Sequence, residues 1–181
     1  MDELGNYIEV PEEFWSFETG KPLAACRLCG KDLMMEGTNY LIEKAFRNDE
    51  TIFEHAMCLD CYAKCHESMS DESKIRIRDY FAEHVDMKQR DLDLLERHGT
   101  DHSKWLGHCM VKGYPLAECG EYQIYGYCID KDLVFSGAPY ALSGEVIEEI
   151  LELLSPQTLG VMKDLSAKLF GIDAPKDLLV F

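Results

Sequence analysis

The chain has 181 residues, of which 46% are hydrophobic, and it carries a formal net charge of −16 with an isoelectric point near 4.7. This length suffices for one ordinary core, or for a small metal module fused to a modest domain. So acidic a chain is repelled by nucleic acid and by anionic membranes, because phosphate binding needs clustered Lys and Arg; we therefore disfavour nucleic acid as a partner and expect no membrane partner.

No targeting segment is expected at the start of the chain. Asp2 and Glu3 are acidic where a signal peptide needs a basic segment followed by an apolar run. No stretch approaches the ~18 apolar residues of a membrane span. We expect a cytoplasmic, reducing location, in which paired cysteines indicate a metal site more often than a disulfide.

Residues 1–21 are predicted to form an acidic arm, since the first twenty residues hold six acidic side chains and no basic one. Pro11 suits the first position of a short helix, where its missing N–H costs nothing. Phe14, Trp15 and Phe17 are too apolar for a free tail. We expect these three to dock on the protein's own core, and docking on a partner is the alternative.

Two CxxC pairs dominate residues 22–69, the predicted zinc-binding module. Cys26 and Cys29 form the first pair, and Cys58 and Cys61 form the second. Two residues between thiols let both sulfurs converge on one ion, and two such pairs complete a tetrahedral site. A closed site of four ligands is structural, because a catalytic zinc keeps a position open for water. We predict one structural Zn²⁺ held by these four cysteines.

The elements around the cysteines follow a recognisable order. Gly30 indicates a tight knuckle after the first pair, residues 40–46 and 51–57 are predicted strands joined by a turn, and residues 58–67 are a predicted helix. This order of knuckle, hairpin and helix resembles the treble-clef, zinc-ribbon-like class of zinc domains. The resemblance covers only this module and implies a fold and a metal, without choosing a function.

Two other side chains compete as metal ligands. His55 lies three residues before the second pair and Cys65 lies one helical turn after it, so either is an alternative ligand. For Cys65, burial as a small apolar side chain is the favoured interpretation. The module is also close to neutral in charge. An alternative role in nucleic-acid or regulatory binding therefore requires its basic residues to share one face: Arg27, Lys31, Lys44, Arg47 and Lys64.

Residues 70–181 are predicted to form an α+β region that packs with the zinc module as one body. Ser70 suits the N-cap of a helix whose apolar face includes Ile77, Tyr80, Phe81, His84 and Val85. A second helix is predicted over 88–98, irregular chain over 100–121, and strands over 122–129 and 132–136. Helices are then predicted after Ser143, after Ser155 and after Asp173. The fold class is therefore α+β, with a treble-clef-like zinc module, a helical region, and a C-terminal β-hairpin plus helices.

A second group of candidate residues is spread over the same region: His98, His102, His108, Cys109, Cys119 and Cys128. Their spacing is poor for a metal site, and a nucleophilic cysteine needs a neighbour that lowers its pKa. Trp105 and the tyrosines at 122, 125, 127 and 140 are candidates for lining a pocket, although such residues are more often core.

Motifs for nucleotide binding, metalloprotease and serine hydrolase chemistry are missing from the sequence. We therefore expect a non-catalytic protein, stabilised by zinc, that binds another protein or a second copy of itself. The alternative is an enzyme with a His/Cys pocket in residues 98–140. That alternative predicts that His102, His108 and one of Cys109 or Cys119 converge in an open cleft.

Overall fold

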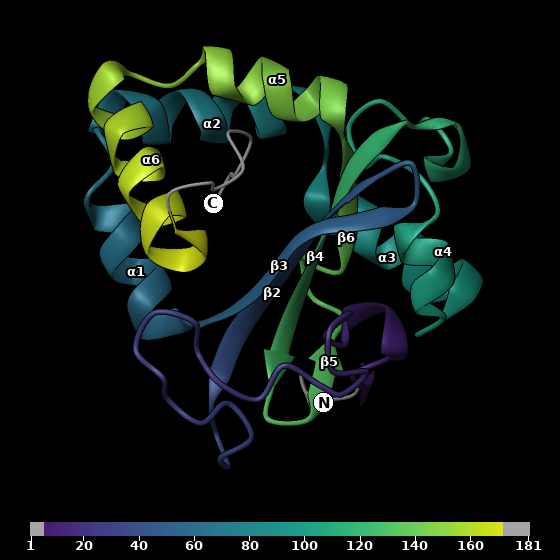
Figure 1. The fold of residues 1–181 in the computed structure, drawn as a ribbon. Helices are drawn as coiled ribbons and strands as arrows, with labels where there is room; N and C mark the ends of the chain where they lie inside the picture. The colour runs from purple at the N-terminus through teal and green to yellow at the C-terminus, as the bar shows by residue number, and fades with distance from the viewer. Residues whose placement is uncertain (1–5, 172–181) are drawn as a thin grey trace.

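An antiparallel sheet runs through the middle of the molecule (Figure 1). The computed structural model describes residues 6–171. Within that part of the chain the sheet has six strands in the order β1-β5-β4-β2-β3, and β6 pairs with β4 beside β5. The strands are β1 Tyr7–Glu9, β2 Asn39–Arg47, β3 Glu50–Cys58, β4 Glu121–Ile129, β5 Asp132–Val134 and β6 Tyr140–Ser143.

Six α-helices surround this sheet over the described residues, which confirms the α+β class. They are α1 Leu59–Glu67, α2 Asp71–His84, α3 Met87–His98, α4 His102–Leu106, α5 Gly144–Glu152 and α6 Pro156–Phe170. Figure 1 shows α1 and α6 together at one end, α2 and α5 along the upper edge, and α3 and α4 at the other end. From residue 6 to residue 171, no helix combines the length and the apolarity that a membrane crossing requires.

The β2–β3 hairpin forms one side of the sheet, with β3 as the edge strand and β2 paired on both sides. Its turn places Asn48 and Asp49 at positive φ, the geometry of the tight hairpin turns that Asn and Asp favour. β2 also pairs along its whole length with β4, from Asn39 opposite Ile129 to Arg47 opposite Glu121. The hairpin of the predicted zinc module therefore shares one sheet with the C-terminal half, and a domain boundary at residue 69 stays a prediction.

The N-terminal segment joins the core, as expected for part of the arm. β1 pairs with β5, and a 3-10 turn over Glu12–Phe14 buries the Phe14 ring completely. The ring lies against Gly126 of β4, where an added Cβ would come within 3.0 Å of it. Phe17 differs from the expectation, because 73% of its surface is exposed.

The sequence-based prediction was wrong in several short stretches. Residues 100–121 include α4, whose start is capped by the Asp101 side chain, and whose Trp105 is buried with Nε1 donating to the Gly99 carbonyl. His84, expected on the apolar face of α2, is exposed, and its Nδ1 lies 2.7 Å from the Tyr80 carbonyl oxygen. The helix predicted after Asp173 lies outside the described residues.

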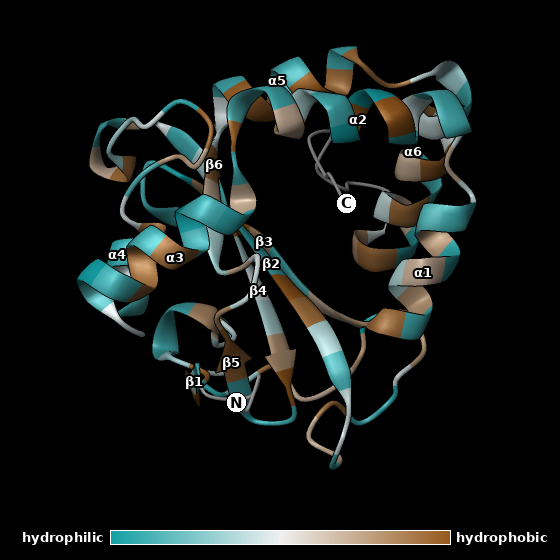
Figure 2. Cartoon of the chain, turned by 180° about the vertical axis from the view of Figure 1, so that it is seen from behind, coloured by the Kyte–Doolittle hydropathy of each residue, from teal (hydrophilic) through white to brown (hydrophobic). Residues whose placement is uncertain are grey.

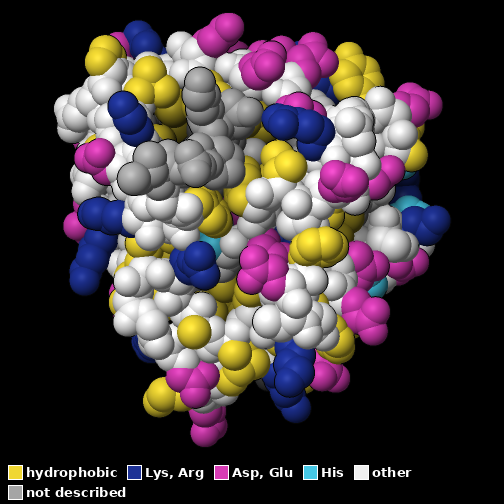
Figure 3. All heavy atoms as spheres, viewed as in Figure 1, with side chains coloured by type: hydrophobic (Ala, Val, Ile, Leu, Met, Phe, Trp, Pro, Cys, Tyr) yellow, Lys and Arg dark blue, Asp and Glu magenta, His cyan; other side chains and the backbone are white. Residues whose placement is uncertain are grey.

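The C-terminal helices confirm the expected caps. The Ser143 side chain accepts a hydrogen bond from the Val146 amide, and the Ser155 side chain accepts one from the Thr158 amide. On α5 the residues Val146, Ile147 and Ile150 are buried, and Figure 2 shows the resulting alternation of hydrophobic and hydrophilic residues along the helix. Acidic side chains gather along the top of the molecule over α5 (Figure 3).

Candidate functional site

The second cysteine pair lies where the hairpin meets α1. Cys58 is the last residue of β3 and the N-cap of α1, while Cys61 sits in the first turn of that helix. The free N–H groups and the positive end of the helix dipole favour negative charge at this position. The junction therefore places both thiols at a helix end that favours the negative charge of a thiolate–metal centre.

The first cysteine pair sits in a knuckle that is fixed to β3. The Cys26 amide donates to the Lys31 carbonyl at 2.9 Å, and the Gly30 amide donates to the Cys26 carbonyl at 2.8 Å. Gly30 has φ +75°, the left-handed conformation expected for it. The Arg27 amide donates to the Ala56 carbonyl at 2.9 Å, which ties the knuckle to the strand that carries the second pair.

The four sulfurs of Cys26, Cys29, Cys58 and Cys61 lie within 4.8 Å of one another. The sulfurs of Cys29 and Cys58 are 3.8 Å apart. Four sulfurs arranged tetrahedrally at the Zn–S distance of ~2.3 Å would be about 3.8 Å apart. Three of the cysteines are buried and Cys29 is exposed at the edge of the group. The four-cysteine group therefore has the composition and the dimensions to hold one metal ion.

The thiols of this group influence one another's ionisation. Burial raises the pKa of Cys26, but hydrogen bonds from backbone amides, led by that of Cys29, outweigh it and lower the pKa to about 7. Burial and the neighbouring thiols raise the pKa of Cys61, and burial raises that of Cys58. The Cys26 thiolate therefore forms readily, while the thiols of Cys58 and Cys61 need the charge of a cation to ionise.

Neither alternative ligand belongs to the group. Over the described residues, the His, Cys, Asp and Glu side chains form one group suited to a metal ion, and it contains neither His55 nor Cys65. His55 points instead toward Glu43 of β2, with its Nε2 3.6 Å from the Glu43 Oε2. Cys65 is partly buried beside the site, in line with its expected role as a small apolar residue.

The second set of candidates, in residues 98–140, is dispersed among separate partners. His102 Nε2 lies 3.0 Å from Glu13 Oε1. The Cys109 sulfur accepts a hydrogen bond from the Ser143 amide, and the Cys119 thiol donates to the Pro115 carbonyl. His98, His108 and Cys128 likewise join no metal-binding group within residues 6–171. His108 and Cys109 line one open pocket, whereas His102 and Cys119 are not among its lining residues, so the predicted convergence of His102, His108 and a cysteine is not seen.

Three of the five basic residues of the module are paired with acidic side chains. Lys44 is buried, with Nζ 3.1 Å from Glu54 Oε2 and donating to the Trp15 carbonyl. Arg47 pairs with Glu121 across β2 and β4, and Lys31 lies 3.7 Å from Asp60. Lys44 therefore does not belong to an exposed basic face of the kind that nucleic-acid binding requires.

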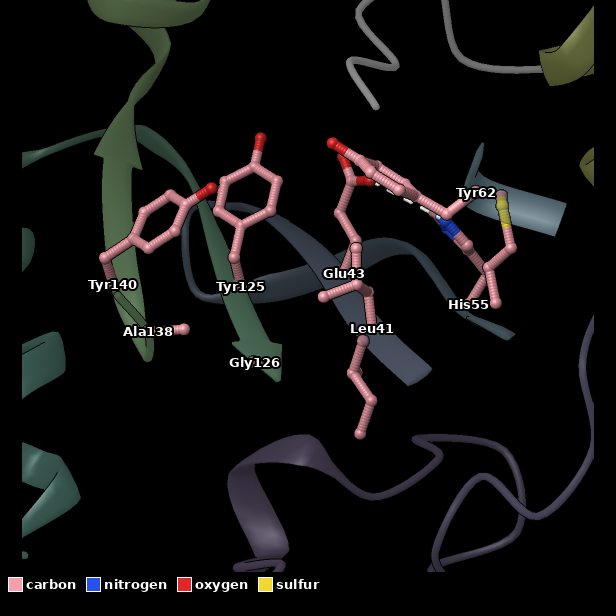
Figure 4. A pocket seen from close by; sticks show the side chains of 10 residues that line it. Leu41, Glu43, His55, Tyr62, Tyr125, Gly126, Ala138 and Tyr140 are labelled. Carbon is pink, nitrogen blue, oxygen red and sulfur yellow. Dashed lines mark ion pairs between the residues drawn. The ribbon is translucent and has the colours of Figure 1, made fainter. Parts of the chain in front are cut away.

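A largely apolar pocket that contains a buried carboxyl group, next to the four-cysteine group, was missed in the sequence. We call it the Glu43 pocket; its side chains include those of Glu43, His55, Met57, Tyr62, Tyr125 and Tyr140 (Figure 4). Glu43 and His55 are buried, and the rings of Tyr125 and Tyr140 stack with centroids 4.8 Å apart. Tyr125 and Tyr140, both named as pocket candidates, therefore line this pocket, whereas Trp105 is buried in the core away from it.

Burial dominates the protonation of the Glu43 pocket. It raises the pKa of Glu43 well above its usual range and lowers the pKa of His55 to about 4, an effect to which the positive charge of Arg27 adds. Burial, followed by the charges of Glu43 and Cys65, raises the pKa of Tyr62 to about 12. At neutral pH all three groups are therefore uncharged in the empty pocket.

Comparison of the chain with protein-family models, with curated proteins and with solved structures found no match. Its function must therefore be inferred from its own residues and their arrangement.

Proposed function

We propose that the chain is a non-catalytic binding protein whose fold is stabilised by one structural zinc ion. The observation that carries this proposal is the convergence of Cys26, Cys29, Cys58 and Cys61 within 4.8 Å. Soft thiolate ligands favour zinc among the common divalent ions of cells. With four thiolates the ion has no open position for water, so its role is structural.

The zinc ion would fasten three elements at one point, namely the knuckle, the end of β3 and the start of α1. The order of these elements supports our assignment of a treble-clef-like arrangement. A structural zinc contributes on the order of 10 kcal/mol of apparent binding free energy, comparable to the stability of a whole domain. We infer that the hairpin and α1 depend on the ion for their relative placement.

The free thiols favour a reducing location for this protein. The eight cysteines, all within the described residues, form no disulfide in the structure. Secreted proteins of this size use such cysteines for disulfides, whereas reducing compartments keep them available for metal. We propose a cytoplasmic location on this ground.

A protein partner or a second copy of the chain is our proposal for the bound species. Phe17 and Ile52, both exposed, flank a groove of about 400 Å³ whose lining combines apolar side chains with charged ones, among them Glu18, Arg27 and Glu54. Exposed apolar side chains around a groove are typical of interaction sites.

Self-association is tested by sedimentation of the zinc-loaded chain at micromolar concentrations. A dimer that Phe17→Ser dissociates and Tyr114→Ser leaves intact supports it, and a monomer throughout contradicts the homodimer form.

The structural role of zinc is tested by thermal unfolding with and without a strong chelator. We expect the chelated protein to lose its cooperative transition, and added zinc to restore it. A protein that releases zinc and keeps the same melting temperature would contradict a structural role.

A further inference from the structure

The proposed zinc site leaves the Glu43 pocket unexplained. Over residues 6–171, three buried side-chain polar atoms lack a hydrogen-bond partner, and two of them are Glu43 Oε1 and His55 Nδ1. An unpartnered buried carboxyl oxygen is energetically costly, so it calls for a reason. Both unpartnered atoms belong to residues that line one pocket.

The sheet places four residues of this pocket in one row. His55 of β3 is opposite Glu43 of β2, Glu43 is opposite Tyr125 of β4, and Tyr125 is opposite Tyr140 of β6. Residues directly opposite on adjacent strands point to the same face, so the four side chains stand beside one another. Figure 4 shows Glu43 between the two stacked tyrosines and His55, with the Tyr62 ring of α1 extending toward its carboxyl group.

The dimensions of the pocket limit what can enter it. It offers about 40 Å³ to the centres of water-sized groups, which is room for a few small heavy atoms. Leu41 and Tyr62 at its edge are only half-buried, so the pocket reaches solvent there. The pocket therefore suits the head group of a small molecule whose remainder lies toward the edge.

The chemistry of the walls selects a cation that carries N–H groups. The unpartnered oxygen of Glu43 needs a hydrogen-bond donor, and hydrogen bonds between charged groups are the stronger ones. Tyr62, Tyr125 and Tyr140 also line the pocket, and the face of an aromatic ring attracts cations; because Tyr125 and Tyr140 stack, each turns only one face away from the other. We propose that the Glu43 pocket binds the primary ammonium group of a small alkylamine, with Glu43 as the carboxylate that accepts its N–H.

Binding is accompanied by loss of the proton that burial keeps on Glu43. An ammonium ion beside the carboxyl favours its ionised form, so the proton leaves for solvent as the ion pair forms. The groups that face Glu43 are His55 from β3, Tyr62 from α1, Tyr125 from β4 and Tyr140 from β6. None of these four side chains carries a positive charge at neutral pH, so none of them can take the place of the ammonium group beside Glu43.

This inference rests on the proposed function, because α1 presents Tyr62 directly after the zinc ligand Cys61. The test therefore uses the intact chain with one zinc per molecule confirmed, so that a failure to bind amine counts against the inference alone. The probe is n-butylammonium, titrated at pH 7.5 by calorimetry and by ligand-observed NMR. Butan-1-ol, which lacks the charge, and tetramethylammonium, which lacks N–H groups, are the comparison ligands.

We expect saturable binding of n-butylammonium and none of the comparison ligands at the same concentrations. Glu43→Gln should weaken binding by about tenfold or more, as expected for a hydrogen bond to a charged group. Glu148→Gln, at an exposed carboxyl of α5, should leave it unchanged. Tyr140→Leu, which keeps an apolar side chain but removes a ring, should weaken binding independently of Glu43.

Three results would overturn the inference. The first is no saturable binding by the zinc-loaded protein, which would leave the pocket to bound water. The second is equal affinity for butan-1-ol or tetramethylammonium, which would remove the ion pair with N–H donation as the basis of recognition. The third is unchanged affinity in both Glu43→Gln and Tyr140→Leu, which would place the amine elsewhere.

Discussion

Glu43 and His55 face each other across the β2–β3 hairpin, with Oε2 and Nε2 3.6 Å apart and both side chains buried. At this distance two charged groups would form a salt bridge. Burial instead raises the pKa of Glu43 and lowers that of His55 to about 4. The pair is therefore a contact between two neutral groups at neutral pH. Glu43 loses its proton only above the pH range usual for a carboxyl group, and His55 gains one only below the range usual for an imidazole.

Acidification should destabilise the folded chain through His55. Its pKa is about 4 when folded and 6.5 when exposed, so stability is full above pH 6.5 and falls as the pH drops toward 4. The expected loss between pH 7 and pH 5 is about 2 kcal/mol. Glu43 acts in the opposite direction, because its raised pKa favours the folded state at lower pH.

Urea unfolding of the wild-type chain and of His55→Asn at pH 7 and pH 5 measures this contribution. Comparing the pH dependence of the two proteins removes the effect of the cysteines, which both retain. We expect the variant to lose less stability on acidification than the wild type. Identical pH dependence would show that His55 does not titrate as its burial indicates.

Replacement of one cysteine of the four-cysteine group should abolish the proposed zinc binding. Cys29→Ser removes the one exposed thiol of the group, so it creates no cavity in the core. We expect loss of the bound zinc and of most of the stabilisation it supplies, on the order of 10 kcal/mol. Cys65→Ser, on the same helix as Cys61 but outside the group, should retain one zinc and serves as the matched control. Retention of zinc by Cys29→Ser would mean that another residue completes the site.

Gly126 is expected to be essential for the attachment of the N-terminal segment. A Cβ at this position would lie 3.0 Å from Phe14 Cε1 and 3.1 Å from Leu133 Cδ1, both in the core. Gly126→Ala should therefore cost about 1–3 kcal/mol in the free energy of unfolding. Gly120→Ala, where the nearest atom is Asn48 Oδ1 at 4.0 Å, should change stability far less. A neutral effect of Gly126→Ala in denaturant unfolding would contradict this close contact.

The caps of α2 and α6 should act as one unit. The Ser70 and Ser155 hydroxyl oxygens lie 2.7 Å apart, while each also accepts from an amide of its own helix, at Ser73 and Thr158 respectively. Each Ser→Ala change should cost ~1 kcal/mol as a lost cap. In a double-mutant cycle, the two changes together should differ from their sum by at least ~0.5 kcal/mol. Additive effects would show that the two caps are independent.

Sequence reasoning succeeded where local chemistry determines structure. The hairpin turn at Asn48 and Asp49, the caps at Ser143 and Ser155, and the left-handed Gly30 each follow from a few neighbouring residues. The four-cysteine group was also predicted from the sequence, because the CxxC spacing brings the two thiols of each pair close together. The strands β1 and β6 and the helix α4 were missed, since they are short and depend on distant partners.

The Glu43 pocket could not be predicted in the same way. The two-residue turn alone would place Glu43 opposite Glu54, but a bulge between Ala45 and Phe46 shifts the register by one residue. This shift brings His55 opposite Glu43 instead. Its second neighbour, Tyr125, arrives from β4 through pairing with a strand about 80 residues away, which no local pattern specifies. The one signal of this pocket in the sequence was the carboxyl side chain of Glu43, which stands in the middle of the mostly apolar strand β2.

The zinc site is tested most directly by measuring the metal content and the metal coordination of the chain purified without added metal. Native mass spectrometry counts the ions per chain, and X-ray absorption at the zinc edge reports their ligands. We predict one zinc per chain, with four sulfur neighbours at ~2.3 Å. A chain that folds without metal, or a zinc with nitrogen or oxygen ligands in place of the four thiolates, would contradict a structural zinc held by Cys26, Cys29, Cys58 and Cys61.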